Sequence, residues 1–275
     1  MTDAVNNAAS DYTGFPPPLT SHVQWCEYTV SAYHVSPYIA EFHNAWTNIF
    51  YAISAILGII ELKTSPSSNP FLLYSERCLL VTAVGSFFFH SNPSSFTELL
   101  DELPMVVLAG CYLMCLKGNH WLLSGGWYIY TIFLMLSIVI VAFISYLIFG
   151  SYELFTTLFT FQTSLPILIT FNLLYNNTNM ERIYFKKAII CIILGRIVWE
   201  YERNLFEFGN CPKGGFGFYA HCYWHLFSSL AHFYFMKVFR GIECRKGRRE
   251  DGGEEDLEMQ RLMQRGRGIE QATKD

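Results

Sequence analysis

Long apolar blocks, separated by short polar connections, follow one another along the chain from about residue 45 to residue 239. Most of them approach twenty residues, the length at which a helix crosses about 30 Å of hydrocarbon. The pattern therefore predicts an all-α polytopic membrane protein, a bundle of seven transmembrane helices. The predicted spans cover about residues 45–62, 79–90, 103–116, 127–149, 155–175, 188–199 and 218–239. The second span is long enough only if it starts near Leu72, with Glu76 and Arg77 at its entry.

The composition strengthens this interpretation. Hydrophobic residues make up 52% of the 275 residues, and charged residues only 15%. A soluble protein of this length would need a very large core to bury so much apolar surface, so we expect the lipid bilayer to be its partner. The formal net charge of −4 is too small to indicate a nucleic-acid partner.

The positions of Lys and Arg predict the orientation, because cytosolic connections are enriched in both. Residues 1–62 contain neither, and the connections after the second, fourth and sixth spans hold only Arg203 and Lys213. The basic residues after the odd-numbered spans are Lys63, Lys117, Arg182, Lys186, Lys187, Arg240, Arg245, Lys246, Arg248 and Arg249. We therefore expect a lumenal amino terminus and a cytosolic carboxyl terminus.

Three parts of the chain follow from this topology. Residues 1–44 form a lumenal amino-terminal segment, and residues 45–240 form the seven-helix membrane domain. Residues 241–275 mix basic and acidic residues with glycine pairs, a composition typical of a disordered or weakly helical tail. We expect this tail to lie in the cytosol and to carry no chemistry.

Two of the eight cysteines fall in segments that the charge pattern places in the lumen. These are Cys26, before the first span, and Cys211, between the sixth and seventh spans. Disulfides form and persist in such compartments, so we expect this pair to be bridged. Two unpaired thiols are the alternative.

Polar residues inside the spans gather at one face of the predicted membrane. His90 ends the second span, Asp101 begins the third, and His221 and His225 begin the seventh. With a lumenal start, even-numbered helices end and odd-numbered helices begin on the lumenal side. All four side chains are therefore expected at the same membrane depth, where ionisable groups are expensive and usually functional.

The spacing of these residues indicates a zinc site. His221 and His225 lie one turn apart on one helical face, so both can reach a single ion. His90 would complete a three-histidine site with one position open for water. Ser86, one turn before His90, would lie near that water or near a developing oxyanion. Asp101 would orient or deprotonate the water and later protonate a leaving amine.

Each of these residues also has a structural interpretation. The histidine pair alone is equally compatible with anchoring at the interface or with hydrogen bonding to a neighbouring helix. Asp101 alone is better explained as a helix cap, because it precedes a Pro that suits the first turn. Ser86 after a glycine commonly serves close helix packing. The remaining histidines, His22, His34, His43, His120 and His232, receive no predicted role.

Taken together, the motifs resemble those of the alkaline ceramidases. Residues 85–90 read Gly-Ser-Phe-Phe-Phe-His, and residues 98–105 read Glu-Leu-Leu-Asp-Glu-Leu-Pro-Met. Residues 221–225 supply a His-x-x-Trp-His motif. Near the start, residues 25–27 read Trp-Cys-Glu and residues 38–41 read Tyr-Ile-Ala-Glu. The similarity extends from about residue 24 to residue 232.

The resemblance implies a seven-helix, zinc-dependent lipid amidase of the endoplasmic reticulum or Golgi membrane. Such enzymes cleave the amide of ceramides into a sphingoid base and a fatty acid. In this family the zinc ligands correspond to His90, His221 and His225. The serine near the zinc-bound water corresponds to Ser86, and the catalytic aspartate to Asp101.

The resemblance also implies a disulfide between the amino-terminal segment and the sixth connection, in agreement with the pairing of Cys26 and Cys211. It further suggests a calcium site, because the family binds calcium with a loop of the form Asp-Trp-Cys-Glu-Glu-Asn and a later Glu.

The matching calcium ligands in this chain are Trp25, through its carbonyl, Glu27 and Glu41. The initial Asp is Gln24 here, the Asn has no clear counterpart, and the stretch before Glu41 is about three residues longer. Since calcium takes six to eight oxygens and gains affinity from carboxylates, the site is expected to be weakened. The alternative is that Glu27 and Glu41 are solvated acids on a lumenal loop.

Two classes of function remain open from the sequence. The favoured one is a hydrolase that cleaves a ceramide-type lipid amide within the membrane. The other is a seven-span receptor or sensor whose zinc site is structural. A related zinc hydrolase acting on another lipid, such as an ester, would keep the site and change the pocket.

Overall fold

The computed structural model describes residues 20–65, 67–149, 152–175 and 180–272. The regular secondary structure of these residues is helical, apart from one isolated bridge between Ser36 and Ile39. The helices are α2 (Cys26–Ser31), α3 (Phe42–Thr47), α4 (Ile49–Thr64), α5 (Pro70–Ser91), α6 (Ser95–Cys115), the 3₁₀ turn η1 (Trp121–Leu123), α7 (Gly125–Phe149), α8 (Tyr152–Leu174), α9 (Met180–Glu207) and α10 (Ala220–Ala272). The prediction of an all-α protein is confirmed.

The apolar blocks of the sequence fall on α4 to α10 in order. Three stretches are helices long and apolar enough to cross a membrane, namely Phe42–Thr64, Pro70–Ser91 and Tyr152–Leu174. The apolar part of α7, Gly125–Val141, is shorter. The protein is therefore a helical membrane protein.

Several helices begin before the apolar block that predicted them, and two of these early starts have a clear cap. Helix α5 starts at Pro70, where Asn69 caps it by accepting a hydrogen bond from the Phe71 N–H at 3.1 Å. This early start makes the second predicted span long enough to cross a membrane. Helix α6 starts at Ser95 behind a reciprocal capping box of Ser94 and Thr97.

The start of α6 corrects one interpretation. Asp101 does not cap the helix, because Ser94 holds that position and Asp101 lies nearly two turns further on. Pro104 lies inside α6 rather than in its first turn. The side chain of Asp101 is thus free of the capping role that was its best explanation in isolation.

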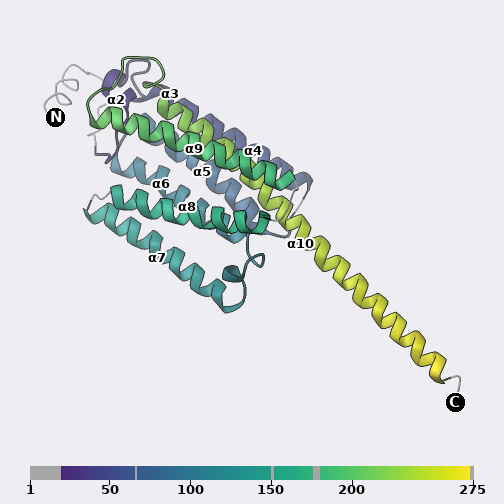
Figure 1. Ribbon diagram of the computed structural model, residues 1–275. Helices are drawn as coiled ribbons and strands as arrows, with labels where there is room; N and C mark the ends of the chain where they lie inside the picture. The colour runs from purple at the N-terminus through teal and green to yellow at the C-terminus, as the bar shows by residue number, and fades with distance from the viewer. Residues whose placement is uncertain (1–19, 66, 150–151, 176–179, 273–275) are drawn as a thin grey trace.

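The helices pack most extensively as neighbouring pairs: α9 with α10, α5 with α6, and α4 with α5. Figure 1 shows α7 on the outer side of the bundle, next to α8. Gly85 allows α5 and α6 to approach closely, since a Cβ at this position would lie 2.0 Å from the Leu100 carbonyl oxygen. Ser86 follows Gly85 and Asp101 follows Leu100, so this close approach brings Ser86 and Asp101 to the same level of the bundle.

The carboxyl-terminal segment differs from its prediction as a disordered or weakly helical tail. Helix α10 continues without interruption to Ala272 and projects beyond the bundle (Figure 1). Glu and Arg, six of each in residues 241–275, have high helix propensity, and a helix already formed in the bundle supplies the costly nucleus in spite of six glycines. The amino-terminal helices α2 and α3 lie at the opposite end of the bundle (Figure 1).

Candidate metal centre and adjoining pocket

Three imidazoles meet at the end of the bundle near α2 and α3. His90 comes from the last turn of α5, and His221 and His225 come from the first two turns of α10. One ligand nitrogen from each residue lies within 4.8 Å of the others, and all three side chains are buried. The two helices thus deliver a compact, buried group of metal-binding nitrogens.

Hydrogen bonds fix which nitrogen of His90 is free. Its Nδ1 lies 2.5 Å from Oε2 of Glu41, and both side chains are buried. Because an ionised carboxylate only accepts, Nδ1 carries the proton and Nε2 keeps its lone pair. The buried Nε2 has no hydrogen-bond partner. A carboxylate behind the imidazole is the usual way in which proteins orient a metal-binding histidine.

Thr47 fixes which ring nitrogen of His225 is free. Its hydroxyl donates to the backbone carbonyls of His43 and Asn44, each at 3.0 Å. It therefore accepts from Nδ1 of His225 at 2.8 Å, which leaves Nε2 of that ring with its lone pair.

His221 is held by packing rather than by such a bond. Its ring lies against the indole of Trp25, with 3.8 Å between the centroids, and its buried Nδ1 has no hydrogen-bond partner. Buried polar atoms are nearly always satisfied, so unpartnered nitrogens on neighbouring imidazoles fit the binding of a metal ion. Three neutral imidazoles are a donor set that suits zinc with one open position.

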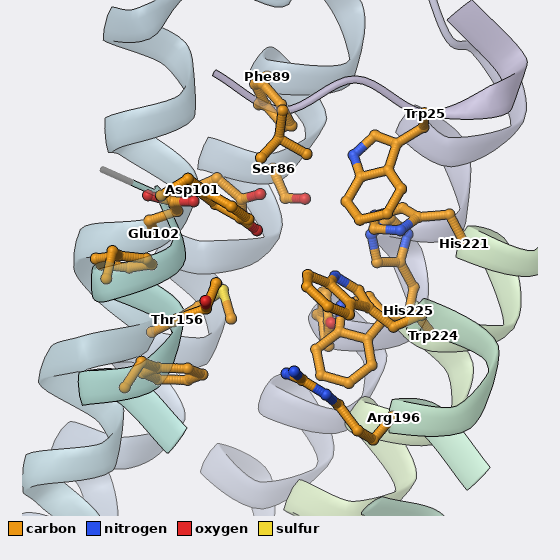
Figure 2. A pocket seen from close by; sticks show the side chains of 17 residues that line it. Trp25, Ser86, Phe89, Asp101, Glu102, Thr156, Arg196, His221, Trp224 and His225 are labelled. Atoms are coloured by element: carbon orange, nitrogen blue, oxygen red, sulfur yellow. The ribbon is translucent and has the colours of Figure 1, made fainter. Parts of the chain in front are cut away.

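A pocket of about 70 Å³ adjoins the imidazoles. Figure 2 shows Ser86 and Asp101 on one side of this pocket and His221 and His225 on the other, with Trp25 above His221. The buried Oγ of Ser86 lies beside the Asp101 carboxyl, with which it interacts, and it has no further hydrogen-bond partner. The pocket can therefore present a hydroxyl and a carboxylate to a molecule that rests on the imidazoles.

A larger, mainly apolar cavity of about 320 Å³ lies deeper in the bundle. It shares lining residues with the smaller pocket, namely Tyr51, Met105, Phe159, Arg196 and Trp224. The two spaces are therefore neighbours with a common wall, and together they offer a polar end and an apolar interior.

The residues expected to bind calcium are not solvated. Glu27 and Glu41 are each 1% exposed, so the alternative of solvated acids is wrong. Oε1 of Glu27 accepts from the N–H of His43 at 2.7 Å and lies 2.8 Å from its Nδ1, while Oε2 accepts from the N–H of Asn44 at 2.9 Å. Burial raises the pKa of the Glu27 carboxyl, and the two backbone N–H groups act in the opposite direction.

The expected disulfide is present between Cys26 and Cys211. It ties the start of α2 to the connection between α9 and α10. The N–H of Cys26 also donates to the buried carboxylate of Glu202 at 3.0 Å. The amino-terminal segment is thus fixed over the same end of the bundle that carries the imidazoles.

The structure brings together His90, His221, His225, Ser86 and Asp101, and it adds residues that the sequence did not single out. Thr47 and Asn44 were missed because ordinary polar residues carry no pattern of their own. Trp25 was expected to act through its carbonyl, whereas its ring packs on His221.

The ceramidase family model matches residues 17–259, most of the chain. The chain belongs to the ceramidase family. Members of this family are hydrolases that act on an amide bond. The match includes all of the residues that form the metal centre and its pocket.

Individual relatives agree with this assignment. The chain is 26% identical over 253 residues to the putative alkaline ceramidase dcd3A of Dictyostelium discoideum, a match that covers 77% of this chain and 83% of that protein. It is 40% identical over 97 residues to the alkaline ceramidase YPC1 of Saccharomyces cerevisiae, covering 35% of this chain and 28% of that one. It is 32% identical over 108 residues to alkaline ceramidase 3 of Mus musculus, covering 39% of each.

Proposed function

We propose that this protein is a ceramidase that hydrolyses the N-acyl amide bond of ceramides within the membrane, giving a sphingoid base and a free fatty acid. The observation that carries the proposal is the buried group of three imidazoles, with unpartnered nitrogens, facing a hydroxyl and a carboxylate across a pocket. The family and the relatives named above support the choice of an amide-bearing lipid.

His90, His221 and His225 are the proposed zinc ligands. Zinc bound there would polarise the amide carbonyl and lower the pKa of a coordinated water to about 7. Glu41 and Thr47 hold the rings of His90 and His225 with their Nε2 atoms free, and Trp25 supports the ring of His221. The three residues are therefore prepared for a ligand before it arrives.

Asp101 is the proposed acid and base. It accepts a proton as water attacks the amide carbon, and it gives that proton to the amine nitrogen as the carbon–nitrogen bond breaks. The hydroxyl of the water remains on the acyl carbon as part of the new carboxyl group. Ser86 donates a hydrogen bond to the carbonyl oxygen, which gains negative charge as the attack proceeds. Its Oγ lies beside Asp101 in the lining of the pocket, which is consistent with this role.

The larger cavity is the proposed seat of a hydrocarbon chain of the substrate. Its lining is largely apolar, and it borders the pocket that would hold the amide. A hydrocarbon chain that already lies in the bilayer can enter this cavity without exposing apolar surface to water, whereas a short polar amide would leave it unfilled.

We further propose that all seven long helices cross the membrane, with residues 1–44 in the lumen, 45–240 as the membrane domain and 241–275 in the cytosol. The basic residues that follow the odd-numbered spans support this orientation. A disulfide in the amino-terminal segment also suits a lumenal location, as expected of an enzyme of the endoplasmic reticulum or Golgi membrane.

The proposed activity is tested by incubating the purified protein with defined ceramides and with ester-bearing lipids, and by identifying the products by mass spectrometry. We expect a sphingoid base and a fatty acid from ceramide, and loss of both in the Asp101→Asn variant. Bound zinc without product would instead indicate a receptor or sensor. Release of fatty acid from esters alone would indicate a hydrolase for another lipid.

A further inference from the structure

The amino-terminal residues that resemble a calcium loop do not fit a calcium ion in this chain. Gln24 is uncharged where the family motif begins with Asp, and Thr29 stands where the motif ends with Asn. The Thr29 hydroxyl donates to the carbonyl of Trp25 at 3.4 Å, and the Thr29 N–H donates to the same carbonyl at 3.3 Å. The one backbone oxygen expected to bind calcium is therefore already an acceptor within α2.

The two carboxylates are also occupied by hydrogen-bond donors. Glu27 faces three N–H groups, two from His43 and one from Asn44. Oε2 of Glu41 lies 2.5 Å from Nδ1 of His90 and accepts from Nδ2 of Asn44 at 3.0 Å. Calcium requires six to eight oxygen ligands, and protein donors already take three of the roughly four lone-pair sites of Glu27 and both sites on Oε2 of Glu41.

These bonds form one continuous path from the amino-terminal segment to the proposed zinc site. Asn44 bridges the two carboxylates, because its N–H reaches Glu27 and its side-chain amide reaches Glu41. Glu41 in turn holds Nδ1 of His90. A change at Glu27 can therefore reach a metal ligand through two intervening residues.

The ring of His43 is positioned to hold the Glu27 carboxylate in place. It is fixed between the Glu27 carboxylate and Tyr219, whose ring meets it edge to face with 5.0 Å between the centroids. Among the described residues that donate to Glu27, His43 alone does so with its side chain, so this is the hydrogen bond that a substitution can remove without altering the backbone.

We propose that hydrogen bonds from His43 and Asn44 take the place of a calcium ion in this chain. They hold Glu27 and Glu41 in position, and they orient His90 for zinc without calcium. His43 and Asn44 are positioning residues, since neither reaches the pocket that would hold the substrate. This inference rests on the proposed zinc site, and it makes the protein a calcium-independent member of its family.

The direct test uses the purified full-length protein in a metal buffer that keeps free zinc constant while free calcium rises from trace levels to about 1 mM, the range of weak extracellular calcium sites. We expect the rate of ceramide cleavage to change less than twofold, and calorimetry to detect no calcium binding. Stoichiometric calcium binding, or a tenfold rise in rate with calcium, would overturn the proposal.

The second test measures zinc affinity by competition with a chelating dye, a readout that does not depend on turnover. His43→Ala is expected to weaken zinc binding about threefold, less than the loss seen when a partner bonded directly to a metal ligand is removed, because Asn44 and Glu41 lie between Glu27 and His90. His43→Gln, whose amide can still donate to Glu27, is expected to recover most of the affinity. His34→Ala is the matched control from the same segment, and it should bind zinc like the unmodified protein. Equal zinc affinity in all three variants would refute the role of His43.

The third test restores the family motif by the double substitution Gln24→Asp and Thr29→Asn. Combined with His43→Ala, it should bind calcium and recover zinc affinity only when calcium is present. Failure to gain any calcium response would count against the interchange of His43 and calcium. If the unmodified protein binds zinc without calcium but cleaves no ceramide, the proposed function fails and this inference stands.

Discussion

Two buried pairs of histidine and glutamate occupy different levels of the same bundle. Near the amino-terminal helices, Nδ1 of His90 lies 2.5 Å from Glu41. Two turns further along α10 than His225, Nε2 of His232 lies 2.8 Å from Glu76. The side chains of both pairs are at most 2% exposed, so burial and charge alone do not separate them.

The second ring nitrogen separates them. Nδ1 of His232 lies 2.6 Å from the hydroxyl of Tyr112, so both nitrogens of that ring are used within the protein. Nε2 of His90 has no such partner. A histidine whose two nitrogens are both bonded joins helices, whereas a buried one with a free nitrogen beside other imidazoles is prepared for a metal.

The surroundings of the two pairs also favour metal binding at His90 and helix packing at His232. His90 lies beside two further imidazoles, the one group of metal-binding side chains found among the residues that the structure describes. The pair of Glu76 and His232 connects α5 to α10, and Tyr112 adds α6. Gly58 of α4 leaves room for the Glu76 carboxylate, because a Cβ there would lie 1.8 Å from Oε1. We therefore assign the deeper pair to helix packing.

The largest expected effect tests the metal-binding side of this comparison. His90→Ala should remove bound zinc and lower ceramide cleavage to the background of the assay, because only two imidazoles remain. Metal content by plasma mass spectrometry and product release measure the two effects. His221→Ala should behave alike, and zinc retained at full occupancy in either variant would show that these histidines are not the ligands.

The next effect tests the packing side. His232→Ala should lower the free energy of unfolding by about 3–5 kcal/mol, since it leaves Glu76 buried without its partner. The folded fraction should still bind one zinc. Thermal unfolding in detergent measures the loss, and the double variant Glu76→Leu with His232→Leu should be more stable than His232→Ala. Zinc loss from folded His232→Ala would instead link this pair to the metal centre.

The two glutamates provide the sharpest matched comparison. Glu41→Gln should weaken zinc binding by about 10–100-fold, because the amide no longer fixes the proton on Nδ1 of His90. Glu76→Gln should leave zinc affinity unchanged while lowering the unfolding temperature. Competition with a chelating dye and thermal unfolding distinguish the two outcomes, and the comparison fails if both variants lose zinc alike.

The smallest effect concerns the hydroxyl groups that lie next to the Nδ1 atoms of His225 and His232. Thr47→Val removes the acceptor for Nδ1 of His225 and should cost zinc binding about 1 kcal/mol, roughly fivefold in affinity. Tyr112→Phe removes the corresponding hydroxyl at His232 and should affect unfolding by a similar amount, with no effect on zinc. Equal zinc affinity in Thr47→Val and the unmodified protein would mean that packing alone sets the tautomer of His225.

Much of the fold follows from local rules. Apolar blocks of membrane-spanning length lie on helices in the predicted order. In lipid a chain must satisfy its own backbone hydrogen bonds, and a helix does so within a single segment. The boundaries were less predictable. Helix α6 starts about two turns before its apolar block, since the capping box at Ser94 and Thr97 outweighs the polarity of the first turns. The charged tail was expected to be disordered or weakly helical, because its composition alone does not show that a helix from the bundle continues into it.

The sequence by itself determined the elements of the site that depend on helical spacing: His221 beside His225, and Ser86 one turn before His90. It also placed Asp101 and these histidines at one end of the helices, through the alternation of direction along the chain. Only the tertiary structure decided which side chains stand behind them. Glu41 reaches His90 across 49 residues and Thr47 reaches His225 across 178, and the partners of Glu27 lie in another helix. A hydrogen bond depends on distances of a few tenths of an ångström between atoms. Spacing along a helix fixes such distances within one element, whereas between elements only packing can do so.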